Sequence, residues 1–100
     1  MTPRTRQQIL RILREHKSEL REKYGVIQLG VFGSYSTDQA TPDSDADIAV
    51  ELRADAKRLH NFLELERYLT RLLDVPVDLG TEQTIHPAMK DAVQREMIYV

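Results

Sequence analysis

The stretch GVFGSYSTDQATPDSDADIAVEL (residues 30–52) contains a Gly-Ser turn after one apolar run and two aspartates at the head of the next. Asp45 and Asp47 are separated by one alanine and followed directly by apolar residues. Because side chains alternate faces along a strand, the two aspartates point the same way, with Cβ atoms about 7 Å apart. Their apolar neighbours point into a core, so packing fixes both carboxylates on one surface.

Two carboxylates held this close repel each other, and each tends to keep a proton. A divalent cation removes the conflict, because Mg²⁺ prefers carboxylate oxygens together with waters and substrate phosphates. A third acid, Asp78, lies in the segment DVPVDLG (residues 74–80), inside an apolar strand where a charge is costly unless it is paired or metal-bound. A single aspartate in such a strand is also commonly exposed at the edge of a sheet. If the strand of Asp78 lies beside that of Asp47, three carboxylates converge on a site for one or two metal ions.

The Gly-Ser turn adds a candidate phosphate site. Gly33 lets the backbone approach a ligand closely, and the amides that follow can hold phosphate if a helical turn begins there. Ser34 contributes a hydroxyl. The segment from Asp38 to Asp55 has six acids and one arginine, so a bare triphosphate is repelled and a metal is required. Each feature alone has an ordinary structural explanation as a turn or a solvated strand end; their combination favours a metal–nucleoside triphosphate site.

Composition excludes several other classes of protein. One hundred residues, 41% hydrophobic and 30% charged, predict a single globular domain over residues 1–100. The absence of cysteine excludes disulfides and thiolate sites, and the three histidines lack zinc spacing. No apolar run approaches the roughly 18 residues of a membrane helix, and the N-terminal segment is polar and basic, unlike a signal peptide. We therefore expect a cytoplasmic protein without a membrane partner.

The net charge of −2 is unevenly distributed. Residues 1–24 carry seven basic and three acidic residues, and the remainder carries seven basic and thirteen acidic residues. A basic helix is a candidate nucleic-acid surface. Here the charges are interspersed with acids and no aromatic platform accompanies them, so a solvated helix face is favoured. Direct nucleic-acid binding is not expected.

Hydrophobic periodicity and glycine and proline positions predict the secondary structure. We expect three helices, over residues 5–24, about 56–73, and from Pro87 onward. We expect three strands, over residues 26–32, 46–52 and 75–79, with Pro76 marking an edge strand or a strand start. This order predicts an α/β (α+β) fold in which helices pack against one small mixed sheet, with an antiparallel pair permitted for the first two strands. The apolar tail (residues 97–100) remains open between core, dimer contact and partner contact.

The segment GSYSTDQATPDSDADIAV (residues 33–50), with VDLG (residues 77–80), resembles the signature of the DNA-polymerase-β-like nucleotidyltransferase superfamily. The short chain and its ending HPAMKDAVQREMIYV (residues 86–100) are similar to the minimal nucleotidyltransferases, the antitoxin partners of HEPN-domain toxins. The resemblance implies a polymerase-β-like nucleotidyltransferase fold.

The resemblance also implies residue roles. Gly33 and Ser34 would hold the triphosphate, and Asp45 and Asp47 would bind a pair of Mg²⁺ ions. Asp78 would complete the second metal site and help to deprotonate the attacking hydroxyl.

One departure from the family pattern is Asp38, where members often have glycine; the added negative charge is expected to weaken nucleotide binding. Arg53, Lys57 and Arg58 are candidate phosphate contacts, although a solvated helix start explains them as well.

The implied activity is transfer of AMP from ATP to a hydroxyl, a tyrosine of a partner HEPN toxin, which silences the toxin. Two alternatives stay open. One is an antitoxin that neutralises its toxin by binding alone. The other is the catalytic subunit of a small-molecule nucleotidyltransferase whose acceptor pocket is completed by a second subunit. A homo-oligomer and a hetero-oligomer with the toxin are both compatible with the sequence.

Overall fold

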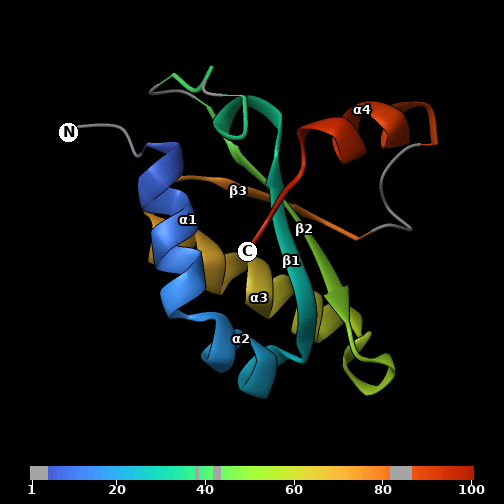
Figure 1. Ribbon diagram of the computed structural model, residues 1–100. Coiled ribbons are helices and arrows are strands. Elements are labelled where there is room, and N and C mark those ends of the chain that lie inside the picture. The colour runs from blue at the N-terminus through green and yellow to red at the C-terminus, as the bar shows by residue number, and fades with distance from the viewer. Residues whose placement is uncertain (1–4, 38, 42–43, 82–86) are drawn as a thin grey trace.

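A mixed β-sheet forms the centre of the computed structural model, which describes residues 5–37, 39–41, 44–81 and 87–100 (Figure 1). Within these segments the sheet has four strands in the order β3-β2-β1-β4. β1 pairs antiparallel with β2 and with β4, and β2 pairs parallel with β3. The strands are β1 (Val26–Phe32), β2 (Ala46–Leu52), β3 (Val77–Gly80) and β4 (Ile98–Tyr99).

Three helices cover one face of this sheet, α1 (Arg6–Glu15), α2 (Lys17–Tyr24) and α3 (Leu59–Leu73). Their apolar stripes pack against the inward side chains of β1 and β2 to form a single buried cluster; its fully buried members include Ile9, Leu13, Leu20, Val31, Ile48, Leu65, Leu69 and Leu73. The hydrophobic burial of these residues is the main stabilising contribution to the fold.

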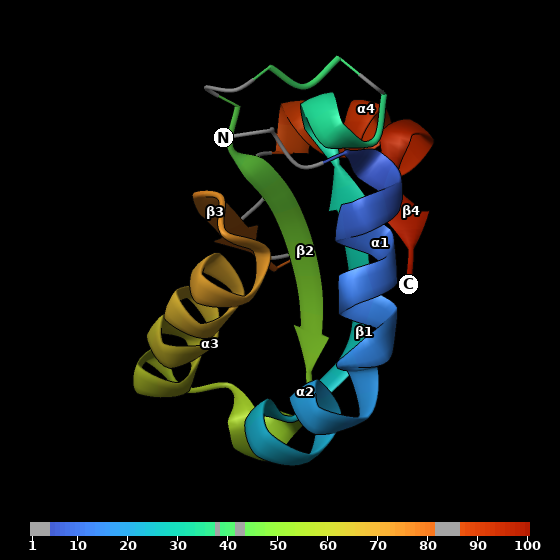
Figure 2. The same ribbon diagram turned by 90° about the vertical axis from the view of Figure 1, so that its left-hand side faces the viewer.

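The opposite face of the sheet is covered in part by α4 (Lys90–Glu96), as Figures 1 and 2 show. Met97, which follows α4, lies directly over Gly30 of β1, where a side chain would collide with it. Gly30 alternates with the core residues Leu29 and Val31, so α4 lies on the side of the sheet away from α1 and α3.

The predicted α/β class and the mixed sheet are confirmed. Two strands have the predicted bounds, residues 26–32 and 46–52. β3 lies at the edge of the sheet, as Pro76 indicated, but it covers Val77–Gly80 and not the predicted residues 75–79, because the strand begins only after the proline.

The single helix predicted over residues 5–24 was wrong, because the helix is broken at His16. The backbone there has ψ of 7°, and His16 Nδ1 lies 2.8 Å from the carbonyl oxygen of Ile12. The break turns α2 across the lower end of the sheet in Figure 1, where it contacts β1. The helix predicted over about residues 56–73 is α3. It begins at Leu59 and not near Ala56, since a 3₁₀ turn (Ala54–Ala56) precedes it.

β4 was not predicted. Ile98 and Tyr99 pair with Val31 and Gly30, and the backbone N–H of Val100 donates to the carbonyl of Leu29 at 2.9 Å. The apolar tail is therefore an edge strand, with Ile98 packed against the core and Tyr99 exposed. None of the helices in the described segments is long and apolar enough to cross a membrane.

We expect Leu69→Ala to lower the free energy of unfolding by about 2–5 kcal/mol, because Leu69 is 0% exposed and its loss leaves a cavity in the core. Leu63→Ala on the same helix is the matched control, since Leu63 is 41% exposed. Urea denaturation monitored by circular dichroism measures both. An equal effect of the two substitutions would contradict the assignment of the buried face of α3.

Candidate active site

The register of the sheet brings the three predicted acids to one face. Asp47 of β2 is directly opposite Asp78 of β3, and Asp45 lies one residue before β2 begins. Ala46 and Ile48 alternate with these acids and are fully buried on the helix-covered face. The acids therefore lie on the α4 side of the sheet, as the alternation of the sequence predicts.

The position of Asp78 depends on the crossover from β2 through α3 to β3. Such a connection places the two strands side by side and parallel, so that both begin at the same end of the sheet. The N–H of Ala46 donates to the carbonyl of Pro76 at 2.8 Å, and Leu79 is buried in the core. These contacts fix the register in which Asp78 meets Asp47.

Asp78 lies within an apolar segment, but its side chain is on the surface. Asp78 is exposed, as is Asp45, whereas Asp47 is half-buried. Val77 packs against the core and Leu79 is part of it, so the apolar character of this segment belongs to the other face of β3. Asp78 is therefore open to water and to any ligand on the acid face, the α4 side of the sheet that carries Asp45, Asp47 and Asp78.

The three acids are suited to a metal ion that binds together with the phosphates of a substrate. Within the described segments, no three His, Cys, Asp or Glu side chains are already gathered in a group that could hold a metal ion. Mg²⁺ does not require such a cage, since it is usually held by one or two carboxylates and completed by waters and substrate phosphates. The cross-strand pair of Asp47 and Asp78 supplies this donor set, with Asp45 at the next position on the same face.

The carboxyl group of Asp47 is destabilised in its ionised form. Burial, followed by the charges of Asp78, Asp45 and Glu96, raises its pKa above the ordinary value. Glu96 lies at the end of α4 and was not singled out from the sequence, because nothing in the periodicity of that helix indicates where it docks. The acid face therefore contains more negative charge than the sequence motif alone predicts.

Gly33 joins the acid face to the Gly-Ser turn. It has φ of +74°, a left-handed conformation that side chains rarely adopt, and it opens the 3₁₀ turn η1 (Gly33–Tyr35). A Cβ at this position would collide with Oδ2 of Asp47. Glycine is therefore required both by the backbone and by the contact with the carboxylate. The one helical turn considered from the sequence is present.

The turn after β1 is rigidly organised. The carbonyl of Gly33 accepts from the backbone N–H groups of Ser36 and Thr37 at 3.1 and 3.2 Å, and from the Ser36 hydroxyl at 2.9 Å. Tyr35, predicted only as a turn residue, is buried in the core, and burial raises its pKa. Within the described residues the hydroxyl of Ser34 has no hydrogen-bond partner, so it is free to donate to a ligand.

The surrounding loop is described in part. The backbone N–H of Thr41 donates to the hydroxyl of Ser44 at 2.9 Å, as expected of a turn. Asp38, predicted to weaken nucleotide binding, and Asp43, predicted as a turn residue, lie outside the described residues.

The other predicted phosphate contacts lie far from the Gly-Ser turn. Arg53 follows β2 at the end opposite Asp47, and its backbone N–H donates to the carbonyl of Gly25. At about 3.3 Å per residue, β2 separates Arg53 from Asp47 by roughly 20 Å. Lys57 and Arg58 continue away from the site toward α3. The alternative interpretation of these three residues as a solvated helix start is therefore favoured.

A small pocket opens beneath α4 on the acid-bearing face. It has a volume of about 150 Å³ and is lined in part by Ala49, two residues along β2 from Asp47. Val93 and Met97 form its apolar side, and Gln94 contributes a polar group. Pockets that enclose a small-molecule ligand commonly measure roughly 300–1,000 Å³, so this pocket is too small to enclose one.

The match to a known family agrees with this geometry. A family model described as nucleotidyltransferase domain matches residues 13–100, which include the turn, the three acids and α4. The chain belongs to the nucleotidyltransferase family. The predicted enzyme class is thus confirmed.

Relatives of this nucleotidyltransferase indicate which branch of the family it resembles. Protein adenylyltransferase MntA of Thermococcus cleftensis is 44% identical over 96 residues, with 96% of each chain covered. A solved structure provisionally assigned as a minimal nucleotidyltransferase has a TM-score of 0.79 and 31% identity, with 98% of each chain covered. The resemblance to minimal nucleotidyltransferases is therefore confirmed.

A further similar structure is that of a tri-AMPylated Shewanella oneidensis HEPN toxin in complex with an MNT antitoxin. It has a TM-score of 0.57 and 26% identity, and the match covers 94% of this nucleotidyltransferase and 66% of the solved chain. A toxin–antitoxin structure with AMP-PNP has a TM-score of 0.66 at 26% identity, covering 94% and 70%. The individual roles of Gly33, Ser34 and the three acids stay predictions.

We expect Gly33→Ala to destabilise the nucleotidyltransferase by at least about 1–2 kcal/mol, because alanine resists the left-handed conformation and its Cβ displaces the Asp47 carboxylate. Ser34→Ala is the control, since removing an unpartnered hydroxyl should change stability by no more than about 0.5 kcal/mol. Thermal unfolding of both variants measures the difference. A Gly33→Ala variant as stable as the wild type would contradict the close contact.

We expect Asp47→Asn to stabilise the metal-free nucleotidyltransferase at pH 7. The pKa of the Asp47 carboxyl is higher in the folded than in the unfolded state, so the unfolded chain loses this proton at a lower pH. The free energy of unfolding of the wild type therefore falls as pH rises from the ordinary to the raised pKa. The variant avoids this loss, and its advantage should disappear near pH 3, where both states are protonated. Urea unfolding in EDTA at several pH values tests this, with the exposed Asp55→Asn as control; a gain that does not depend on pH would oppose the electrostatic cause.

Proposed function

We propose that this nucleotidyltransferase is a Mg²⁺-dependent protein adenylyltransferase, acting as the antitoxin of a HEPN toxin. It transfers AMP from ATP to a tyrosine hydroxyl of that partner. The observation that carries the proposal is the contact between Gly33 and the Asp47 carboxylate, since it sets a candidate phosphate site directly against the acid face.

Each part of the site has a role in holding the nucleotide. The turn at Gly33 and the free hydroxyl of Ser34 bind the terminal phosphates, and Asp45, Asp47 and Asp78 hold the metal. Mg²⁺, when bound, neutralises the phosphate charge and orients the triphosphate. The raised pKa of Asp47 is consistent with this role, because a carboxylate crowded by other acids gains from a nearby cation.

The chemical step is an in-line displacement at the α-phosphorus. The acceptor oxygen forms a bond to phosphorus, the bond from phosphorus to the β-phosphate oxygen breaks, and pyrophosphate leaves. The hydroxyl proton passes to the carboxylate of Asp78, which is exposed and can release it to water. Catalysis comes from positioning and charge stabilisation rather than from covalent chemistry by the protein.

A protein acceptor fits the shape of the chain. The pocket beneath α4 is too small to enclose a small-molecule acceptor, and residues 1–100 act as a single minimal nucleotidyltransferase domain in this proposal. The acceptor then arrives on the surface of a partner, in a hetero-oligomer. The AMPylated HEPN toxin bound to a related MNT antitoxin supports the same assignment here.

A tyrosine is the acceptor that suits this site. Its hydroxyl has a pKa of about 10 and so loses its proton more readily than the hydroxyl of serine or threonine. A carboxylate is a weak base, so it takes the proton more readily from a more acidic acceptor hydroxyl. The nucleotide is ATP in this proposal, in keeping with the adenylyltransferase name of the relative MntA.

The test incubates the purified chain with α-labelled ATP, Mg²⁺ and the product of the neighbouring reading frame. We expect label on a tyrosine of the partner, dependence on Mg²⁺, and at least a 100-fold loss of labelling in the Asp45→Asn/Asp47→Asn variant. Asp55→Asn should label normally, because Asp55 is exposed and lies in the turn beyond the opposite end of β2.

Neutralisation of toxin activity separates the alternatives. If the Asp45→Asn/Asp47→Asn variant still binds the partner and still neutralises it, occlusion is the mechanism and the proposal of an enzymatic antitoxin is wrong. Label that appears on a small molecule and never on protein would instead identify a small-molecule nucleotidyltransferase.

A further inference from the structure

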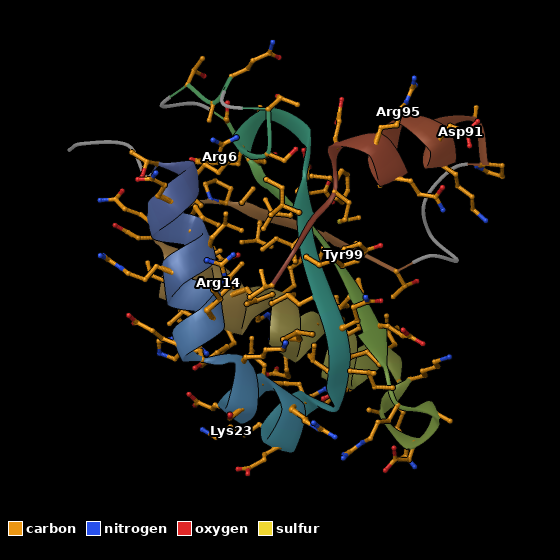
Figure 3. All side chains as sticks on the ribbon, in the orientation of Figure 1. Arg6, Arg14, Lys23, Asp91, Arg95 and Tyr99 are labelled. Carbon is orange, nitrogen blue, oxygen red and sulfur yellow. The ribbon has the colours of Figure 1, made fainter. Side chains whose placement is uncertain are left out.

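Arg6, at the start of α1, lies against the Gly-Ser turn. Its Nη1 donates a hydrogen bond to the carbonyl oxygen of Ser36 at 3.1 Å, and the contact is partly buried. Figures 1 and 2 both place the start of α1 beside the turn that follows β1, and Figure 3 shows the Arg6 side chain extending toward that turn. A guanidinium from a distant part of the chain is thus held against the turn that begins with Gly33 and Ser34, at the carbonyl of Ser36.

This guanidinium keeps most of its binding capacity. It carries five N–H donors and a permanent charge, and the bond to Ser36 uses one of its nitrogens. The ion pairs within the described segments are Lys23–Glu19, Arg53–Asp55 and Arg67–Glu64, so Arg6 has no acidic partner there. A half-buried cation with no ion pair among the described residues is suited to an anionic ligand.

The position of Arg6 is poor for the stability of α1. The helix dipole favours acids in the first turn, and α1 has none there, so Arg6 faces the positive end of the dipole. The helix start is already satisfied by a capping box between Thr5 and Gln8. A residue that opposes its local structure without a compensating gain is characteristic of a functional site.

Within the described residues, the charged side chains that shift the pKa of Asp47 are all acidic. Asp45, Asp78 and Glu96 surround Asp47 with negative charge, while Arg53 lies roughly 20 Å along the strand. The terminal phosphates of a triphosphate carry the most negative charge of the ligand and would lie at the turn. Arg6 is placed to offset that charge.

We propose that Arg6 is a phosphate-binding residue that contacts the terminal phosphates of the nucleoside triphosphate and stabilises the departing pyrophosphate. This inference rests on the function proposed above and adds a residue to it. Bidentate contact of the guanidinium with phosphate oxygens gives both charge and orientation, while the bond to Ser36 holds the side chain in place.

The test compares binding of ATP and AMP to the full chain, with Mg²⁺, by isothermal titration calorimetry. We expect Arg6→Gln to weaken ATP binding about 10- to 100-fold, as loss of charge-assisted hydrogen bonds does, and to change AMP binding less than threefold. Arg6→Lys should recover part of the loss, because it keeps the charge without the planar fork. Arg11→Gln, an exposed position on α1, should leave both affinities unchanged.

A purely structural role gives a different result. If Arg6 only orders the turn, Arg6→Lys will bind ATP as weakly as Arg6→Gln, and Thr37→Val, which removes a hydroxyl bonded to the Gly33 carbonyl, will weaken ATP binding as much. Either result overturns the inference. If the wild type and Arg6→Gln bind ATP equally well, the inference about Arg6 is wrong and the proposed function is unaffected. Wild-type protein that neither binds ATP nor transfers AMP overturns both.

Discussion

The contact between Gly33 and Asp47 is the constraint on which the site depends. Pairing of β1 with β2 sets Phe32 opposite Asp47, so the chain leaves the sheet beside the carboxylate. A side chain at the next position would collide with that carboxylate, and glycine avoids the collision and supplies the left-handed turn as well. The anchoring of Tyr35 in the core then holds the turn in place. A glycine, a carboxylate and a buried aromatic ring thus fix one another.

The sequence predicted the parts of this arrangement that depend on local pattern. Alternation along the strand placed Asp45 and Asp47 on one face, whereas the position of Asp78 beside them was only a condition, which the parallel pairing of β2 and β3 meets. The positions of Arg6 beside Ser36 and of Glu96 near Asp47 were not predicted, because each depends on the docking of a helix on the sheet and leaves no sign in its own periodicity. The break at His16 and the two-residue strand β4 were missed for the same reason. Tertiary packing, rather than propensity, decides them.

The charges of the site work against the fold that carries them. Asp47 is crowded by three other acids, and Arg6 opposes the dipole of its own helix. The proposed ligand, which contains metal ions and phosphates, would relieve both arrangements, since each charge would then have a partner of opposite sign. Such conflicts between local stability and site composition are expected where binding, and not folding, selected the residues.

The crossover through α3 has a consequence for how the protein responds to its surroundings. Asp47 and Asp78 belong to strands joined by a long helix, so the unfolded chain offers no assembled cradle for a charged ligand. Whatever bridges β2 and β3 therefore recognises the native form alone and adds its binding free energy to the fold by mass action. If the substrate binds there as proposed, the melting temperature rises with the concentration of free ligand, and the protein resists unfolding and proteolysis best when its substrate is abundant.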